Sequence, residues 1–206
     1  MPRLIDVRRL QVDAVEEVFD MLDRYEDATE TIDDYDLQRW IAQMSAVELN
    51  GTWERYVERR LVAQLNRKPA HFIKANDIRG ITAITSGLAV YIIRGGRSYF
   101  DFRGSGDLKG KIKAWFSEAD NPFQELDDDA WGYIDTLAAT RNCIVHGSDV
   151  SIDRYRKMLR VVYGMRLIPS PSEFLNAQDQ RANSPARRKP RLLGLAEVIM
   201  QAIEQT

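Results

Sequence analysis

The sequence has little of several features that identify common classes of protein. Its single cysteine, Cys143, excludes an intramolecular disulfide framework and a cysteine-rich zinc site. No apolar run approaches the roughly 18 residues that a membrane-spanning helix needs. The N-terminal segment, MPRLIDVRRL, lacks the apolar core of a signal peptide. We therefore expect a cytoplasmic protein that does not associate with membranes.

An excess of charge of either sign is also missing. The 29 lysines and arginines nearly balance the 31 aspartates and glutamates, and the formal net charge is −2. No global field therefore attracts nucleic acid, so any binding of RNA or DNA must come from a local cationic patch. A P-loop for nucleotide phosphates is excluded too, because Gly104-Ser105-Gly106 is too short and is not followed by Gly-Lys-Ser/Thr.

Clusters with metal-ligand spacing are not evident. The chain has two histidines, and the acidic residues at 33–36 and 127–129 stand next to one another, as charges at the start of a helix do. No set of His or Cys accompanies them. We expect no metal ion and no cofactor.

What the chain does have is helical periodicity. At 206 residues with 44% hydrophobic residues it is long enough for one good-sized core. Apolar residues recur at steps of three and four, and no strand alternation competes with them. Gly51 interrupts one long pattern, where it indicates a kink or a close helix crossing. The predicted helices cover residues 7–25, 37–61, 76–92, 108–116, 130–146, 151–163 and 192–203. The fold class is all-α.

The expected organisation is a single helical domain over 1–165, with an irregular insertion in the middle of the chain. Residues 164–190 contain four prolines and end in Arg-Arg-Lys-Pro. This composition predicts that 166–190 form a basic linker or loop, disordered in part. Segment 191–206 is then an appended helix that docks on the bundle or on a partner.

The irregular insertion, residues 94–106 (RGGRSYFDFRGSG), interleaves arginines with aromatic residues. Aromatic rings stack on bases and arginines bind phosphates, so Arg97 and Arg103 are candidates for RNA binding. The other interpretation is a loop whose aromatic side chains pack back onto the bundle.

The main candidate site is Arg141-Asn142-Cys143-Ile144-Val145-His146-Gly147, at the end of a predicted helix. Arginine offers a planar fork of donors suited to phosphate, and histidine transfers protons near neutral pH. Residues four apart share a helix face, so Asn142 and His146 project together. Arg141 and His146 are about 140° apart around a regular helix. Only the reach of the arginine, unwinding at Gly147 or a second protomer would bring them to one phosphate.

The number of proton-transfer groups also favours a second protomer. Cleavage of RNA without a metal ion needs a base for the 2′-hydroxyl proton, an acid for the leaving 5′-oxygen, and positive charge at the phosphate. One His146 does not easily fill both proton-transfer roles, whereas two copies across a dimer axis do. His71, the other histidine, lies among Pro69, Ala70 and Phe72, which suggests a packed helix edge.

These residues resemble the HEPN superfamily, whose ribonuclease members carry an Arg-x4–6-His motif, commonly RN-x3-H, near a helix end. Arg141-Asn142-x3-His146-Gly147 matches this pattern. The run Thr52-Trp53-Glu54-Arg55-Tyr56-Val57 is similar to the Trp-Glu-x-aromatic helix of the RiboL-PSP branch. The resemblance covers residues 35–165.

The resemblance implies a helical bundle that dimerises, with the two motifs lining a shared cleft. It also implies metal-independent endoribonuclease activity in a toxin–antitoxin, phage-defence or stress-response role, with an antitoxin or operon partner protein. Arg141 would bind the scissile phosphate, His146 would be the acid/base, and Asn142 would orient the phosphate or the histidine. Glu54 would be an accessory residue that fixes Arg141; alternatively it is an exposed carboxylate beside Arg55 and Arg59.

Two other functions stay open at this point. The chain is alternatively a non-catalytic HEPN-type helical module that binds a nucleotide, RNA or a protein partner. The third possibility is a purely structural dimer, in which Arg141 and His146 pair with acidic residues of the core. Cys143 is expected to be a small core residue rather than a nucleophile, because no second histidine is spaced to activate it.

Overall fold

The computed structural model describes residues 4–100, 102–180 and 188–206. Over these ranges the chain is all-helical, with 72% helix and no strand, which confirms the predicted fold class. The helices are α1 (Val7–Thr31), α2 (Tyr35–Arg67), α3 (Ala70–Ala75), α4 (Ser86–Arg94), α5 (Ser105–Trp115), the 3₁₀ turn η1 (Glu118–Asp120), α6 (Asp128–His146), α7 (Asp149–Tyr163), α8 (Pro171–Asn176) and α9 (Arg191–Glu204).

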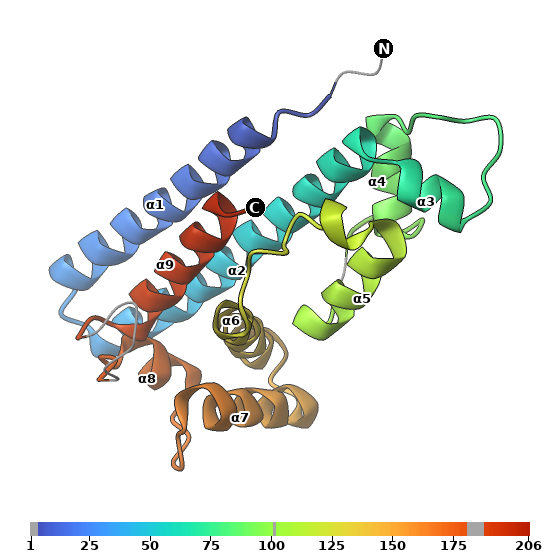
Figure 1. Ribbon diagram of the computed structural model, residues 1–206. Coiled ribbons are helices and arrows are strands. Elements are labelled where there is room, and N and C mark those ends of the chain that lie inside the picture. Colours follow the sequence, from blue (N-terminus) through green and yellow to red (C-terminus); the bar gives the residue numbers. More distant parts are fainter. Residues whose placement is uncertain (1–3, 101, 181–187) are drawn as a thin grey trace.

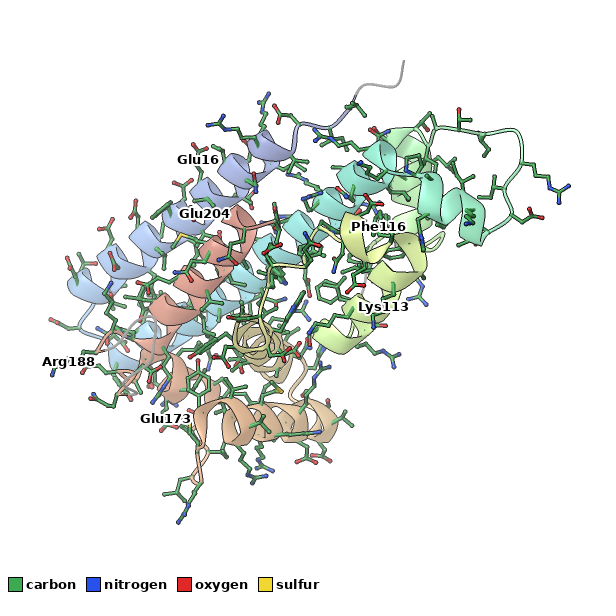
Figure 2. All side chains as sticks on the ribbon, viewed as in Figure 1. Glu16, Lys113, Phe116, Glu173, Arg188 and Glu204 are labelled. Carbon is green, nitrogen blue, oxygen red and sulfur yellow. The ribbon has the colours of Figure 1, made fainter. Side chains whose placement is uncertain are left out.

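Three helices that run side by side, α1, α2 and α9, form the main body of the molecule (Figure 1). Glu16 of α1 and Glu204 of α9 line a shallow groove along α1 (Figure 2). Helix α6 crosses α2 and α9, while α7 and α8 lie on the side away from α1 (Figure 1). Helices α3, α4 and α5 gather around one end of α2, so the middle of the sequence forms a lobe of its own.

Helix α2 is the central element of this arrangement. Asp34 caps its start by accepting hydrogen bonds from the N–H groups of Asp36 and Leu37. The helix then runs without a break through Gly51 for 33 residues. A glycine inside a helix costs about 1 kcal/mol. Leu49 precedes Gly51 and Trp53 follows it, and the burial of both side chains outweighs that cost.

The helix predicted over 76–92 begins only at Ser86, so the prediction was wrong for residues 76–85. Asp77 and Gly80 adopt positive φ angles of 48° and 79°, which no right-handed helix accommodates. Thr85 then caps the real helix through a hydrogen bond from Leu88 N–H. The apolar spacing between residues 78 and 85 therefore belongs to a loop.

The predicted linker was wrong for residues 171–176, which form α8. Ser170 and Glu173 make a reciprocal capping box at its start. Phe174 and Leu175 of α8 are completely buried against α2, α6 and α9. Residues 181–187, the most polar part of the predicted linker, lie outside the described residues.

Helix α9 docks on the bundle and is a part of the core rather than an appendage. Leu192 and Ile203, near its two ends, are fully buried. The backbone oxygen of Ile203 accepts a hydrogen bond of 3.1 Å from the Tyr56 hydroxyl of α2. Burial raises the pKa of Tyr56 above its ordinary value, because the phenolate would lose its hydration.

A chain of aromatic rings fixes α6 against α2. Phe123, in the segment that precedes α6, packs edge-on against Trp53 of α2 and Trp131 of α6, with ring centroids 6.0 and 6.3 Å apart. This contact holds the first half of α6 in the core. Burial continues along α6 as far as Thr140, and the helix becomes exposed only at Val145 and His146. The last residues of the helix carry the candidate site.

Candidate functional site

The candidate site lies at the C-terminal end of α6. Asp127 caps the start of this helix through a 2.7 Å hydrogen bond from Ala130 N–H, and Gly147 ends it in the left-handed conformation, with φ 55°. Both boundaries match those expected from the sequence. His146 is the last helical residue and is exposed to solvent. Its imidazole is therefore accessible to a substrate.

Asn142 binds the arginine of the motif. The Nη1 atom of Arg141 donates a hydrogen bond of 2.8 Å to Oδ1 of Asn142, and both residues are half-buried. The Asn142 amide thus restrains one edge of the Arg141 guanidinium and does not occupy the N–H donors on its other two nitrogens. Sequence reasoning assigned Asn142 to the phosphate or to His146. The contact in the structure is with Arg141 instead.

The regular helix keeps Arg141 and His146 apart. Because α6 stays helical through His146, unwinding at Gly147 does not turn the histidine toward Arg141. The two side chains leave the helix about 140° apart, whereas Asn142 and His146 project from one face. A single chain therefore offers one guanidinium and one imidazole that point in different directions.

Glu54 is not joined to this site within one chain. Among the described residues, no hydrogen bond or ion pair connects it to Arg141, and its accessory role stays a prediction. Glu54 is half-buried in α2, one turn before Glu58. Glu58 forms an ion pair with Arg94 of α4, with 2.6 Å between Oε1 and Nε. Residues four apart share a helix face, so Glu54 lies on the side of α2 nearer to α4.

The insertion between α4 and α5 packs part of its aromatic side chains onto the bundle, as one of the two interpretations expected, and leaves its arginines exposed. Phe100 and Phe102 pack against each other with ring centroids 5.5 Å apart, and Phe100 also contacts Trp115 of α5. Tyr99 is 60% exposed. Both candidate RNA-binding residues, Arg97 and Arg103, are also exposed. Asp101 lies outside the described residues.

Helices α6 and α7 anchor the end of this insertion, about two turns of α6 before Asn142 and three turns before His146. Asp135 of α6 accepts two hydrogen bonds from Ser105, 2.7 Å from its N–H and 2.6 Å from its hydroxyl. Arg154 of α7 donates a 2.5 Å bond to the backbone oxygen of Arg103. Gly104, at φ 102°, lies so close that a Cβ atom would be 2.4 Å from the Arg154 guanidinium.

Asp135 and Arg154 are the residues that sequence reasoning missed. Asp135 precedes Asn142 by seven residues and His146 by eleven, so it projects from the same face of α6 to within about 20°. The spacing of seven and eleven residues could have placed Asp135 on this face from the sequence alone. The face of α6 that carries Asn142 and His146 thus continues, about 10 to 16 Å along the axis, to the anchor of the arginine-bearing insertion.

Cys143 behaves as a small core residue. It packs against the hydrophobic core, and burial raises the pKa of its thiol, because the thiolate would lose its hydration. The nearby positive charge of Arg156 lowers the pKa by less. A raised pKa reduces the thiolate fraction at neutral pH and makes a nucleophilic role less favourable.

Neither a metal cluster nor a membrane span is evident. Within residues 4–100, 102–180 and 188–206, no group of three or more His, Cys, Asp or Glu side chains is arranged to hold a metal ion. No helix in these ranges is long and apolar enough to cross a membrane.

Comparison with known proteins finds no matching family model, no similar curated protein and no similar solved structure. The resemblance to the HEPN superfamily therefore depends on the short motifs themselves.

Proposed function

We propose that this chain is a metal-independent endoribonuclease that acts as a homodimer of HEPN type. The observation that carries the proposal is the arrangement at the end of α6. Asn142 holds the Arg141 guanidinium through a 2.8 Å hydrogen bond, while His146, one turn after Asn142, is open to solvent. A restrained cation binds the phosphate as charge develops on it, and an accessible imidazole transfers protons.

The reaction is an in-line attack of the RNA 2′-hydroxyl on the neighbouring phosphorus. A neutral His146 takes the 2′-hydroxyl proton as the bond between O2′ and phosphorus forms. The bond between phosphorus and O5′ breaks, and a protonated His146 from the second protomer gives its proton to the leaving O5′. Arg141 stabilises the added negative charge on the phosphate. The products are a 2′,3′-cyclic phosphate and a 5′-hydroxyl end, with no oxidant, metal ion or water consumed.

Exposed aliphatic side chains next to His146 support a dimer around this site. Val145 and Val150 flank the histidine and are 48% and 80% exposed. Larger apolar patches rimmed by polar residues mark protein contacts, and these two valines would contribute to such a patch in the proposed dimer. An isologous contact through these valines would bring two copies of His146 near one axis.

The exposed arginines of the insertion are the proposed RNA contacts. Arg103 lies at the anchor formed by Asp135 and Arg154, on the side of α6 that carries His146. An RNA strand in the site would pass within reach of its side chain, and Arg97 would bind the strand further on. We propose that these contacts are to the phosphate backbone, which positions the strand and carries no sequence information.

The decisive experiment compares cleavage of RNA by the wild type and by His146→Ala, with and without EDTA. We expect His146→Ala to lower the cleavage rate at least about a hundredfold, since general acid–base catalysis contributes about 10² to 10⁴. EDTA should have no effect. His71→Ala is the matched control, because it removes the other histidine and should leave the rate unchanged.

The outcome that contradicts the proposal is a wild-type protein that binds or ignores RNA without cleaving it, while the helical circular dichroism spectrum stays intact. Binding without cleavage would instead favour a non-catalytic HEPN-type module for RNA or nucleotides.

The dimer has a separate test. Wild-type chains are mixed with increasing amounts of His146→Ala chains under conditions of subunit exchange. If one site needs a histidine from each protomer, activity falls with the square of the wild-type fraction. A linear fall would mean that each chain acts alone, and would contradict the shared site.

The biological setting that we propose, a toxin–antitoxin, phage-defence or stress-response system with an antitoxin or operon partner, rests on the resemblance alone. A ribonuclease of this kind is expected to slow growth when expressed alone. The His146→Ala variant should then be harmless, which a growth assay with both variants would measure.

A further inference from the structure

A second candidate site lies in a cleft of about 430 Å³ where α1, α2 and α4 meet. Its volume falls within the range usual for sites that hold small molecules, about 300 to 1,000 Å³. None of its lining residues comes from α6 or α7, so it is separate from the motif around His146. The residues that line it are Ile5, Leu10, Arg55, Glu58, Arg59, Val62, Val90 and Arg94.

The apolar part of the lining is aliphatic. Ile5 and Leu10 come from the start of the chain, Val62 from α2 and Val90 from α4. No tryptophan, tyrosine or phenylalanine is among these lining residues. A flat nucleobase would have no aromatic ring on which to stack, whereas a flexible hydrocarbon chain would gain from burial against such walls.

The polar part of the lining is cationic. Three arginines and one glutamate give it a formal excess of two positive charges. Arg55 is paired with Glu17 of α1 at 2.7 Å, and Arg94 is paired with Glu58 at 2.6 Å. These ion pairs, between α2 and α1 and between α4 and α2, fix the two guanidiniums at the sides of the cleft.

Arg59 is the lining arginine that remains available. It is exposed, and it forms no ion pair or hydrogen bond with any of the residues that the structure describes. Arg59 lies four residues after Arg55 and three before Val62, so the three side chains share one face of α2. A carboxylate would meet its donor fork beside an apolar wall, which is the geometry that an amphiphilic anion requires.

We infer that the cleft binds an aliphatic carboxylate, with the carboxylate on Arg59 and the hydrocarbon chain against Ile5, Leu10, Val62 and Val90. Arg55 and Arg94 keep their acidic partners and hold the sides of the cleft in place. The inference does not depend on ribonuclease activity, because no residue of the cleft belongs to the motif at the end of α6.

The test is calorimetric titration of the full chain with octanoate, octanamide and acetate. Octanoate is expected to bind with one site per chain. Octanamide keeps the hydrocarbon chain without the charge, and acetate keeps the charge without the long chain. Each should bind at least about tenfold more weakly, because a hydrogen bond to a charged group and a buried apolar chain each contribute at least that much.

Variants locate the site. Arg59→Gln should weaken octanoate binding about tenfold or more, and Val90→Trp should abolish it by filling the cleft. The matched control is Arg79→Gln, because Arg79 is an exposed arginine in the loop before α4 that pairs with Asp77 and lies outside the cleft. Thermal unfolding of each variant confirms that the chain is folded.

Three results would overturn the inference: no saturable octanoate binding, equal binding of octanamide, or octanoate binding that Arg59→Gln leaves unchanged in a folded protein. Binding to phosphatidylglycerol vesicles without binding of free octanoate would also overturn it, since the cleft would then belong to a membrane-contact surface.

Discussion

The end of α6 and the cleft between α1, α2 and α4 both present arginine, and they hold it in different ways. At the end of α6 the partner of Arg141 is the neutral amide of Asn142. In the cleft the partners of Arg55 and Arg94 are carboxylates, Glu17 and Glu58. A neutral acceptor leaves the charge of the guanidinium uncompensated, whereas a carboxylate cancels it.

This difference separates two uses of the same side chain. An uncompensated cation at an exposed helix end is suited to negative charge that develops during a reaction. Compensated cations at the walls of a cleft contribute to the fold. In the proposed site they leave ligand binding to Arg59, the lining arginine that has no partner among the described residues. Substitutions at the end of α6 should therefore change the rate of RNA cleavage. Substitutions in the cleft should change the stability of the fold or the binding of a ligand.

The largest effect is expected from Arg141→Ala. Removal of the cation that we propose to bind the phosphate should lower the rate of RNA cleavage by about 10² to 10³, as the loss of one transition-state donor does. Arg141→Lys keeps the charge and loses the planar fork, so it should recover only a part of that rate. Single-turnover cleavage of one RNA substrate by the three proteins measures both effects. Equal rates for wild type and Arg141→Ala would remove Arg141 from the mechanism.

A smaller effect is expected from Asn142→Ala, because in the proposed mechanism Asn142 acts on the phosphate only through Arg141. Loss of the 2.8 Å hydrogen bond should lower kcat about tenfold, with little change in KM, since the arginine remains but is less well positioned. Asn142→Gln, whose amide can still reach a guanidinium, should recover some of the rate. An unchanged kcat, or a loss that follows the melting temperature alone, would assign Asn142 a structural role.

At the end of α6, the position of the helix and the face that carries Asn142 and His146 could be predicted from the sequence. The acidic start at Asp127, the helical spacing and the glycine at position 147 predicted both ends of α6, so the face shared by Asn142 and His146 followed from periodicity alone. What the sequence does not contain is the direction of the Arg141 side chain. Its contact with Asn142 is a choice among rotamers that tertiary packing makes.

The cleft could not be anticipated in the same way. Arg55, Arg59 and Val62 share a face of α2 by their spacing, but Val90 and Arg94 join them only because α4 packs beside α2. The helix predicted from 76 to 92 would have placed α4 incorrectly, since Asp77 and Gly80 turn the chain before Ser86. The same limitation applies to α8, which is too short for a periodic signal and is recognised by its Ser170 cap and buried Phe174.

The stability of the folded chain should respond more at the cleft than at the end of α6. Glu58→Gln leaves Arg94 without its half-buried partner and should lower the free energy of unfolding by about 1 kcal/mol. Arg141→Gln, which loses one contact to a neutral amide, should change it by less than about 0.5 kcal/mol. Urea unfolding of both variants tests the ranking, and a double-mutant cycle of Glu58 with Arg94 isolates the ion pair. The opposite order would contradict the distinction between compensated and uncompensated arginines.

The smallest effect concerns the insertion that carries Arg103. The backbone N–H of Arg103 donates a 2.9 Å hydrogen bond to Oδ2 of Asp107. This bond, together with the hydrogen bond and positive charge of Lys111, lowers the pKa of Asp107 below its ordinary value of 3.8. A carboxylate with a lowered folded-state pKa contributes stability above the unfolded pKa, and that contribution is lost as the pH falls through the folded value. The insertion should therefore loosen only below about pH 4.

Amide hydrogen exchange of Arg103, corrected for the intrinsic effect of pH, would detect the loosening in the wild type. Asp107→Asn should exchange faster at neutral pH and lose the acid dependence, because its amide accepts the same hydrogen bond more weakly. Asp107 lies at the surface, where solvent weakens charge interactions, so the overall stability should barely change. If exchange at Arg103 shows no acid transition, its backbone is held instead by Arg154, whose guanidinium stays charged throughout and whose contact joins the insertion to the helices beside His146.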